Sequence, residues 1–232
     1  MFISAIIPVY NENKIIKKNI IEIYKFFSSN YNFEIIVIDD ASTDNSLEIL
    51  KSINIKNLII LENKVNLGKG SSIINGIEKS SGNLILVTDA DLSAPISEFN
   101  KLFKKKIKGY DIVIGSRNKI NSEVTLKQGI VRMIFGKCFN LIIKYLLVLK
   151  FSDTQCGFKL FDAEKIKKIV SNCYVKRFCI DVEILYLAKI YNFKVYEQGI
   201  IWNNNKDTSV RIIRDSINMF FDILKIRFRK YK

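Results

Sequence analysis

The sequence contains no histidine, which removes the most common catalytic base and a frequent metal ligand from all 232 residues. Ser-His-Asp and Cys-His mechanisms are therefore excluded. Four cysteines are present without C-x-x-C spacing, so neither a zinc site nor a secreted disulfide framework is expected. Any acid, base or metal ligand must come from Asp, Glu, Lys, Tyr or Cys, and reduced thiols in a cytosolic compartment are expected.

Long apolar runs and linker residues are also scarce. The N-terminal stretch MFISAIIPVYNEN turns polar too early for a signal peptide. The longest apolar run, LIIKYLLVL at 141–149, falls short of the roughly 18 residues that span a bilayer. With two prolines, ten glycines and no internal repeat, the chain is expected to form one domain, or one domain with an extension.

Positive charge is abundant, because 37 Lys and Arg residues face 23 Asp and Glu residues, a net charge of +14. Such a balance favours nucleic acid, an anionic membrane surface or phosphorylated substrates as partners. A generally lysine-rich proteome explains it equally well. The basic C-terminal stretch KIRFRKYK is more specific and favours contact with a membrane surface.

The first half of the chain alternates between buried strands and helices. The apolar patterns predict strands at 2–9, 33–40, 57–63, 83–91 and 110–117. The intervening segments predict helices at 14–28, 42–52, 68–82 and 97–109. This alternation indicates an α/β fold with a parallel sheet and right-handed crossovers.

Polar clusters stand where these predicted strands end: Tyr10-Asn11-Glu12, Asp39-Asp40, Asp89 with Asp91, and Gly115-Ser116-Arg117. In parallel sheets, ligands bind beyond the carboxyl ends of the strands. The four clusters are therefore expected to meet at one edge of the sheet.

The pattern changes after Arg117. A long helix, apolar nearly all round, is predicted over 125–149, and a polar loop with the sequence DTQCGFKLF follows at 153–161. Further predictions are helices over 163–171 and 181–191, a strand over 194–202, and an amphipathic basic end at 216–232.

Asp89 and Asp91 carry the most specific chemical signal. Two carboxylates facing a diphosphate would repel it, by roughly 3 kcal/mol per charge pair at ~6 Å and an effective dielectric of ~20. A nucleotide diphosphate here would therefore require Mg²⁺ or Mn²⁺, which prefer hard oxygen ligands. The alternative is that Asp91 or Ser93 caps the helix after Pro95. We favour the metal.

Two other motifs are ambiguous alone. NLGKGSSI is not a Walker loop, and a glycine-adapted helix entry explains it as well as phosphate binding does. Arg117 suits bidentate phosphate binding, but a surface ion pair is an equal alternative.

Taken in order, SAIIPVYNE, EIIVIDDASTDNS, NLGKG, VTDADLSAP and GSR resemble the motifs of family 2 glycosyltransferases. The resemblance implies the GT-A fold, a Rossmann-like, mostly parallel sheet with helices on both faces. In the second half DTQCGFKLF, DVEILYLA and IIWNN resemble the polyprenyl-phosphate branch, which includes dolichyl-phosphate β-glucosyltransferases and bacterial relatives. The resemblance to this branch implies a catalytic domain over 1–210 and an amphipathic basic helix over 211–232 that contacts a membrane surface.

The resemblance also implies site residues. Nucleotide-sugar contacts would come from Pro8, Tyr10, Glu12, Asp40, Lys69, Asp89, Ala90, Asp91 and Arg117. Mg²⁺ or Mn²⁺ would be held by Asp89 and Asp91. Acceptor and phosphate contacts would come from Arg132, Gln155, Lys159 and Arg211. The catalytic set would be Asp153, Asp91 and Arg117, with Asp153 as a base or sugar-orienting group.

The sequence departs from the family pattern in two places. Ile180 precedes the D-V-E motif where relatives carry phenylalanine, and a structural or capping role for Asp181 and Glu183 stays open. After the tryptophan, 207–209 reads Asp-Thr-Ser where relatives carry G-S-K. The lysine that would make one phosphate contact is thereby missing, and Lys206 or Arg211 could substitute for it.

The implied reaction is inverting transfer of a hexose, with UDP-glucose favoured as donor, to a polyprenyl or dolichyl phosphate. A phosphate monoester has its second pKa near 6, so the acceptor is already largely dianionic and needs no strong base. The enzyme would lie on the cytoplasmic face of a membrane, the endoplasmic reticulum in a eukaryote or the plasma membrane in a bacterium. A homo-oligomer stays open.

The nearest alternatives are a GDP-mannose-dependent enzyme and a family member with a non-lipid acceptor. A sugar-nucleotide pyrophosphorylase would need a glycine-rich loop after the first strand, where this chain has PVYNE. A basic RNA-binding protein is a remote alternative, because acidic strand ends would repel a phosphate backbone. No nucleic-acid partner is therefore expected.

Overall fold

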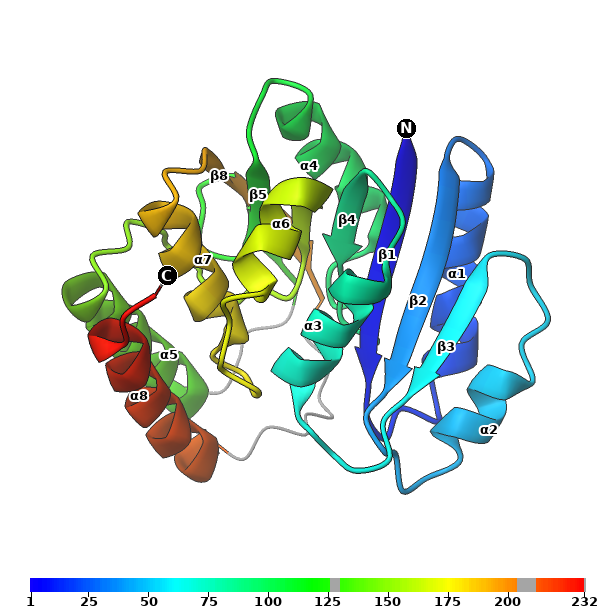
Figure 1. Cartoon of the computed structure of the whole chain (residues 1–232), viewed down its shortest axis with the longest axis horizontal. Coiled ribbons are helices and arrows are strands. Elements are labelled where there is room, and N and C mark those ends of the chain that lie inside the picture. The colour runs from blue at the N-terminus through cyan, green and yellow to red at the C-terminus, as the bar shows by residue number, and fades with distance from the viewer. Residues whose placement is uncertain (126–129, 204–211, 232) are drawn as a thin grey trace.

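A seven-stranded sheet forms the middle layer of the protein (Figure 1). The structure is a computed structural model that describes residues 1–125, 130–203 and 212–231. The strand order of the sheet is β3-β2-β1-β4-β7-β5-β8. The strands of the main sheet are β1 (Phe2–Val9), β2 (Asn32–Asp39), β3 (Leu58–Glu62), β4 (Leu84–Val87), β5 (Ile112–Ser116), β7 (Lys159–Asp162) and β8 (Val195–Gly199).

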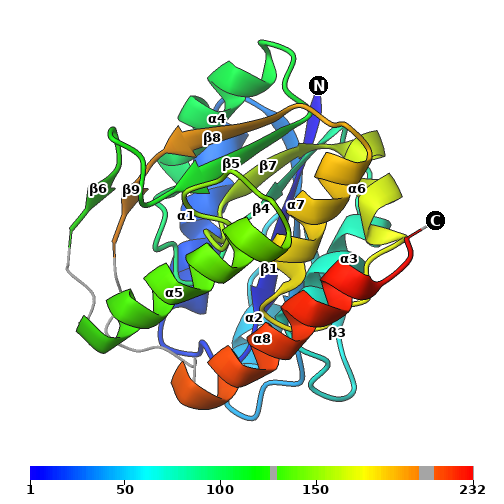
Figure 2. The same ribbon diagram turned by 90° about the vertical axis from the view of Figure 1, so that its left-hand side faces the viewer.

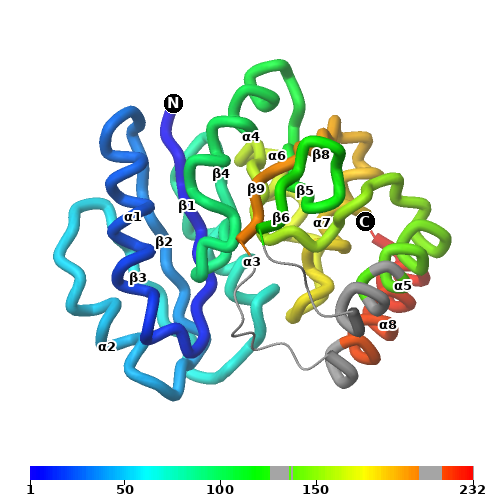
Figure 3. Tube along the Cα trace, turned by 180° about the vertical axis from the view of Figure 1, so that it is seen from behind, coloured from blue at the N-terminus to red at the C-terminus, as the bar shows by residue number. Residues whose placement is uncertain are grey.

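Helices cover both faces of the sheet. They are α1 (Ile16–Ser28), α2 (Ser46–Lys51), α3 (Lys69–Lys79), α4 (Phe99–Lys106), α5 (Ile130–Leu146), α6 (Ala163–Val170), α7 (Ile180–Ile190) and α8 (Ile212–Phe228). A short 3₁₀ turn at Ile96–Glu98 precedes α4. Figure 1 shows α3, α6 and α7 in front of the sheet, and the view from behind shows α1 on the other side (Figure 3).

The strands are apolar on both faces, which explains why helices cover both. Ile6 and Ile38 pack in one core cluster with residues of α3, α6 and α7. Ile7 and Val37, their immediate neighbours along the strands, pack in a second cluster with residues of α1 and α4. Buried parallel strands have this composition because successive side chains point to opposite faces. The sequence prediction of a mostly parallel α/β sheet with helices on both faces is confirmed.

One strand was wrongly predicted as loop. The segment 153–161 contains the start of β7, which runs antiparallel between β4 and β5. Lys159 pairs with Val87 on one side and with Ile114 on the other. Four residues are too few for a recognisable period, and the hydrogen bonds that define this strand come from two neighbours distant in sequence. Because β7 is antiparallel, the segment before Lys159 lies at the carboxyl ends of β4 and β5.

The predicted strand 194–202 is divided between two sheets. β8 pairs with β5, whereas β9 (Ile201–Trp202) pairs with the short β6 (Glu123–Val124). Ile200, fully buried, lies at the switch: its N–H donates to the Ser116 carbonyl, and its own carbonyl accepts from the N–H of Glu123. The chain thus changes partners without interrupting its apolar pattern, which is why the sequence reads as one strand.

Helices α5 and α8 lie side by side along one flank of the molecule (Figure 2). The predicted helix over 125–149 is observed as the shorter α5, since 147–149 are not helical, and the predicted amphipathic end at 216–232 falls mostly within α8. Ile223 and Ile226 of α8 are buried in the core cluster shared with α7, so α8 is tied to the sheet domain by packing. Across the described ranges, every helix falls short of the length and apolarity that crossing a bilayer requires.

Candidate functional site

The loops after β1 and β2 are joined by hydrogen bonds. Asn11 adopts a left-handed conformation with φ of 58°, and its N–H donates to Ser42 Oγ at 3.0 Å. Its side-chain oxygen accepts from the N–H of Thr43 at 2.7 Å. Tyr10 is consequently held at the surface of this edge, and the N–H of Glu12 donates to Ser46 Oγ. Pro8 lies one step further back, inside β1.

Asp40 anchors the loop that leads into α3. Its Oδ1 accepts from Asn63 Nδ2 and from the N–H of Leu67, and its Oδ2 accepts from the N–H of Gly68 at 2.8 Å. The residue is almost completely buried. Both oxygens therefore already serve to place Lys69, and a direct contact between Asp40 and the nucleotide stays a prediction.

Two buried side-chain oxygens lack a hydrogen-bond partner within the described ranges, Asp39 Oδ1 and Thr154 Oγ1. The other Asp39 oxygen accepts from the N–H of Ser42, the residue that also holds Asn11. Leaving a buried acceptor unpaired costs free energy, so such atoms are common where a ligand completes a site. The sequence analysis placed Asp39 in a polar cluster at this edge but gave it no specific contact, and it did not single out Thr154.

Lys69 bridges the start of α3 and the segment after β4. Its Nζ lies 2.6 Å from Asp89 Oδ1, and the two side chains are 21% and 28% exposed. Burial alone would raise the pKa of the Asp89 carboxyl, but the Lys69 ammonium, with Lys159 and Arg117 near, holds that pKa below its usual range. Both groups are thus charged at neutral pH and open to a ligand.

The glycines beside Lys69 are required by packing. Gly68 has a φ of 95°, and a Cβ there would lie 2.6 Å from the Lys176 carbonyl oxygen. A Cβ on Gly70 would lie 2.8 Å from the Val175 carbonyl oxygen. The interpretation of G-K-G as a glycine-adapted helix entry thus has a physical basis: the segment 175–177 crosses directly over the start of α3.

Asp91 closes a turn at the end of β4. Its Oδ1 accepts from the N–H of Ser93 at 2.9 Å, and its Oδ2 accepts from Ser93 Oγ at 2.7 Å. Between the two aspartates Ala90 is buried, and its carbonyl accepts from Asn19 Nδ2 of α1 at 2.8 Å. The alternative prediction, a cap on the helix after Pro95, is wrong, because no side chain caps the 3₁₀ turn at Ile96–Glu98 or α4. Asp91 instead closes a local turn with Ser93 and stays partly exposed.

Asp89 and Asp91 fit a divalent cation delivered with a nucleotide. They offer hard carboxylate oxygens from the end of one strand, and both are partly exposed. Within the described ranges, no cluster of three or more His, Cys, Asp or Glu residues could hold a metal by itself. Mg²⁺ sites of this kind use one or two carboxylates and leave the other positions to phosphate oxygens and water.

Gly157 allows Asp89 to reach its position. A Cβ added to Gly157 would overlap all three terminal atoms of the Asp89 carboxylate. We expect Gly157→Ala to lower the affinity for Mn²⁺ together with UDP by about 100-fold, because a shift of only about 1 Å in a site can have that effect. Isothermal titration calorimetry measures it. Gly136→Ala on α5, where a Cβ meets no atom within 4 Å, is the matched control and should bind normally. Equal affinities of the two variants would contradict the expectation.

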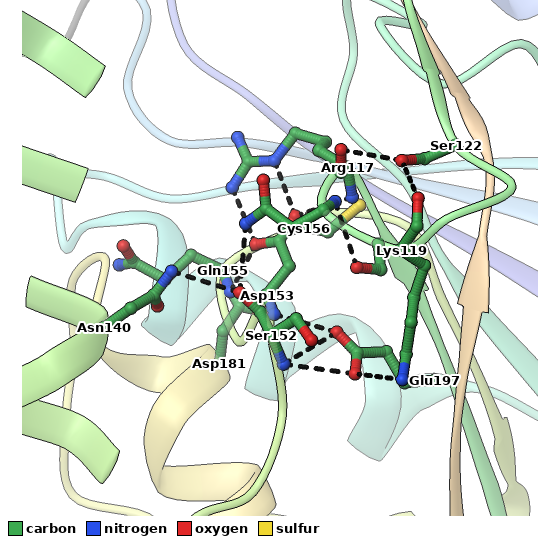
Figure 4. Close-up of polar contacts among 12 residues, drawn as sticks. Arg117, Lys119, Ser122, Asn140, Ser152, Asp153, Gln155, Cys156, Asp181 and Glu197 are labelled. Atoms are coloured by element: carbon green, nitrogen blue, oxygen red, sulfur yellow. Dashed lines mark hydrogen bonds and ion pairs between the residues drawn. The ribbon is translucent and has the colours of Figure 1, made fainter. Parts of the chain in front are cut away.

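Arg117, directly after β5, and Asp153, in the segment before β7, form a bidentate ion pair (Figure 4). Arg117 Nε lies 2.7 Å from Asp153 Oδ2, Nη2 lies 2.8 Å from Oδ1, and the Arg117 N–H also donates to Oδ2. The guanidinium lies 5.0 Å from the centre of the Trp202 ring. Burial alone would raise the Asp153 pKa, but Arg117 holds that pKa below its usual range. Asp153 is therefore a stable carboxylate that positions Arg117, and this disfavours a role as base.

Glu197 on β8 holds the backbone that carries Asp153 of this ion pair. Its Oε1 accepts from the N–H groups of Ser152 and Asp153 at 2.9 and 2.8 Å, and Lys119 Nζ lies 3.4 Å from Oε2 (Figure 4). The sequence prediction missed Glu197, because β8 has the mixed composition Val-Tyr-Glu-Gln-Gly, in which a glutamate gives no local signal.

Lys159 is buried inside the protein and forms an ion pair with Asp181. Lys159 Nζ lies 2.6 Å from Asp181 Oδ1 and also donates to the Cys156 carbonyl. Only 1% of the Lys159 side chain is exposed, so it does not lie on a surface that an acceptor could reach. The contact between Lys159 and the acceptor stays a prediction, and the buried geometry favours a structural role.

Three other predicted residues are placed less fully. Gln155 is partly buried beside Asp153, and its N–H donates to Asp153 Oδ1 at 3.3 Å. Arg132 belongs to α5, but its side chain lies outside the described residues. Arg211 and the segment 206–209 also lie outside them.

Glu183 has a structural role. Its carboxylate accepts from the N–H groups of Tyr174 and Val175, and from the hydroxyl of Tyr231 near the C-terminus. Burial raises the pKa of this carboxyl. Through Val175, Glu183 fixes the segment that covers the start of α3.

The edge thus gathers alternating charges from segments far apart in sequence. Lys69 pairs with Asp89, Arg117 with Asp153, and Lys159 with Asp181. An internally neutralised cluster beside the partly exposed Asp91 can accept a dianionic ligand and a divalent cation together. It offers no histidine, and burial raises the pKa of its thiol, Cys156, to about 12. The cluster therefore suits electrostatic stabilisation of a departing diphosphate better than covalent catalysis.

Comparisons with known proteins find sequence relatives that are named as glucosyltransferases. The chain is 34% identical to a dolichyl-phosphate β-glucosyltransferase of Dictyostelium discoideum, covering 99% of this chain and 75% of that protein. It is 31% identical to the dolichyl-phosphate β-glucosyltransferase of Saccharomyces cerevisiae, over 98% and 74% of the two chains.

Solved structures show the same fold. Glucosyl-3-phosphoglycerate synthase from Mycobacterium tuberculosis, crystallised with Mn²⁺, UDP-glucose and glycerol 3-phosphate, superposes with a TM-score of 0.73 at 15% identity, covering 97% of this chain and 79% of that one. Mannosyl-3-phosphoglycerate synthase from Rubrobacter xylanophilus gives a TM-score of 0.72 at 18% identity, over 97% and 72% of the two chains.

The family comparison covers most of the site described above. The sequence model for glycosyl transferase family 2 matches residues 4–170, which include Asp89, Asp91, Arg117 and Asp153. The match spans more than half of the chain, and the relatives extend the similarity to nearly all of it. The chain therefore belongs to glycosyl transferase family 2 and is a glycosyltransferase.

Proposed function

We propose that this enzyme transfers glucose from UDP-glucose to the phosphate of a dolichyl or other polyprenyl phosphate, with inversion at the anomeric carbon. The observation that carries the proposal is the 34% identity over 99% of the chain to a dolichyl-phosphate β-glucosyltransferase. The charged edge of the sheet supplies groups suited to that chemistry.

The donor would lie over the carboxyl ends of the strands. Tyr10 and Glu12 would line the base and ribose, and the unpaired Asp39 oxygen would accept an N–H of the base. Asp89 and Asp91 would hold Mg²⁺ or Mn²⁺, which when bound neutralises charge that develops on the departing UDP. Lys69 and Arg117 would add positive charge on the protein side of the diphosphate.

The acceptor phosphate would attack the anomeric carbon from the opposite face of the sugar. It is already largely dianionic at neutral pH, so no proton needs to be removed. Asp153 would orient Arg117 toward the phosphates, and Gln155 would lie near the sugar. Arg132 and Arg211 are proposed as further acceptor contacts. Positioning and electrostatic stabilisation would supply most of the rate enhancement.

A lipid acceptor requires contact with a membrane surface, and α5 and α8 offer it. The exposed apolar residues along this flank are Leu141, Tyr145, Val148, Ile217, Phe220, Phe221 and Phe228. Exposed basic residues accompany them at Lys144, Lys225, Arg227, Arg229 and Lys230. An apolar stripe beside basic residues suits the interface of an anionic bilayer. We therefore propose peripheral binding of the sheet domain, through α8, to the cytoplasmic face of a membrane.

Exposed phenylalanines should carry part of this binding. The Phe221→Ser/Phe228→Ser double variant is expected to lower binding to anionic liposomes at least about tenfold, because burying one Phe contributes about 1.5–3 kcal/mol. Cosedimentation measures it. Ile107→Ser at the end of α4, on the opposite face of the sheet, is the control and should bind normally. Point variants are cleaner than truncation, because Ile226 and Tyr231 pack against the core. Full binding by the double variant would refute the proposed surface.

The reaction is tested by the donor and acceptor together. Purified enzyme, Mn²⁺ and dolichyl phosphate would be incubated with radiolabelled UDP-glucose or GDP-mannose, and the lipid product identified by mass. Glucosyl phosphoryl dolichol is the expected product. Mannosyl lipid instead would identify the GDP-mannose alternative, and transfer to non-lipid acceptors alone would reject the lipid assignment.

A further inference from the structure

The Lys69 ammonium is paired with Asp89, one of the two carboxylates to which the divalent cation is assigned. We propose that Lys69 is an internal counterion of Asp89. The Lys69 ammonium leaves Asp89 to the divalent cation only when a nucleotide diphosphate binds that ammonium instead. Metal and nucleotide then bind with strong positive coupling, and the metal alone binds weakly. This inference rests on the proposed function, in which Asp89 is a metal ligand.

The geometry makes the two cations rivals for one oxygen. The Lys69 ammonium lies 2.6 Å from Asp89 Oδ1. A Mg²⁺ ion binds a carboxylate oxygen at about 2.1 Å, so an ion on the same oxygen could lie at most about 4.7 Å from the ammonium. A divalent cation entering alone would thus meet the Lys69 ammonium at close range, in surroundings that burial makes less polar than water.

The surrounding charges strengthen this rivalry. Besides Lys69, the positive charges of Arg117 and Lys159 also act on the Asp89 carboxylate. Asp91 is the only other proposed metal ligand. The negative charges of a diphosphate would reverse the balance, since they attract both the ammonium and the metal.

The backbone of Lys69 is fixed while its side chain is accessible. Asp40 Oδ2 holds the N–H of Gly68, and the Lys176 carbonyl accepts from the N–H of Ser71 at 3.0 Å. The start of α3 therefore stays in place, and only rotation of the Lys69 side chain moves the ammonium. That side chain is 21% exposed on the edge where the nucleotide is expected. Exchange of partners needs no movement of the fold.

The inference is tested with Mn²⁺ and UDP, without turnover. Free Mn²⁺ would be measured by electron paramagnetic resonance during titration of wild type and Lys69→Met, with and without UDP. In wild type, UDP is expected to tighten Mn²⁺ binding about 100-fold, within the range of known coupling between sites. In Lys69→Met, Mn²⁺ alone should bind about tenfold tighter than to wild type, and the coupling should fall by at least the same factor.

Controls separate this effect from a general loss of positive charge. Lys51→Met removes a lysine paired with Glu62 on the surface and should leave Mn²⁺ affinity unchanged. Lys69→Arg keeps the charge and should keep most of the coupling, and thermal unfolding reports whether each variant folds. If Mn²⁺ alone binds Lys69→Met no tighter than wild type, Lys69 is a permanent structural partner and the inference is wrong. Glucosyl transfer by wild type would then still support the proposed function, whereas absence of transfer would reject that function separately.

Discussion

Asp91→Asn is expected to lower the rate of glucosyl transfer about 1,000-fold, comparable to the largest losses seen when one electrostatic contact to a developing charge is removed. The amide has no charge to hold a divalent cation, yet its oxygen can still accept from the N–H of Ser93, so the turn should survive. Initial rates across a Mn²⁺ titration would measure the loss. Glu62→Gln, a carboxylate-to-amide change in an exposed pair, is the matched control and should remain fully active.

Comparison with Asp153→Asn tests the mechanism. Both Asp153 oxygens are engaged by Arg117, so this variant should loosen the guanidinium and reduce transfer less than Asp91→Asn does. A far larger loss in Asp153→Asn, together with disappearance of the acidic limb of the pH–rate profile, would mean that Asp153 is the base after all. The low pKa that Arg117 imposes on Asp153 speaks against that outcome.

The second large effect is expected in stability. Lys159→Met should lower the free energy of unfolding by about 3–5 kcal/mol, because it leaves Asp181 buried without its counterion. Urea unfolding followed by circular dichroism measures this difference. The matched control Lys51→Met breaks an exposed pair and should change stability by less than about 1 kcal/mol.

A double variant separates structure from acceptor binding. Lys159→Met/Asp181→Leu removes both buried charges and should recover most of the lost stability, since apolar replacement of a buried pair is often neutral or stabilising. If the single variant unfolds like wild type, the ion pair has no structural weight. If the double variant is stable but has lost affinity for the acceptor specifically, Lys159 is an acceptor contact as the family resemblance implies.

Local pattern was sufficient for the parallel part of the fold. The strands β1, β2 and β4 are rich in Ile, Val and Leu and require cover on both faces, and polar residues follow where the apolar residues end. Because parallel strands present their carboxyl ends to one edge, this order alone predicts that Tyr10, Asp40, Asp89 and Arg117 gather there. The D-x-D spacing indicates a metal because carboxylates alone would repel a diphosphate.

The same pattern could not predict which side chains pair with one another. Which cation pairs with Asp89, which oxygen of Asp40 holds Gly68, and whether Lys159 is buried all depend on contacts between segments 20 or more residues apart. An ion pair forms where the folded chain brings two charges within about 4 Å and excludes water, and neither condition leaves a mark on local sequence.

The same limit explains β7 and the residues around it. Its four residues form a strand because they pair with β4 on one side and with β5 on the other. Its antiparallel direction places Asp153 and Gly157, which precede it, at the site. Glu197 then fixes Asp153 from a strand that follows more than 40 residues later. The amino-acid order thus dictates where chemistry gathers in this protein, through short-range periodicity. The three-dimensional packing of distant segments dictates which charge neutralises which, because electrostatic pairing depends on distance in space and not on distance along the chain.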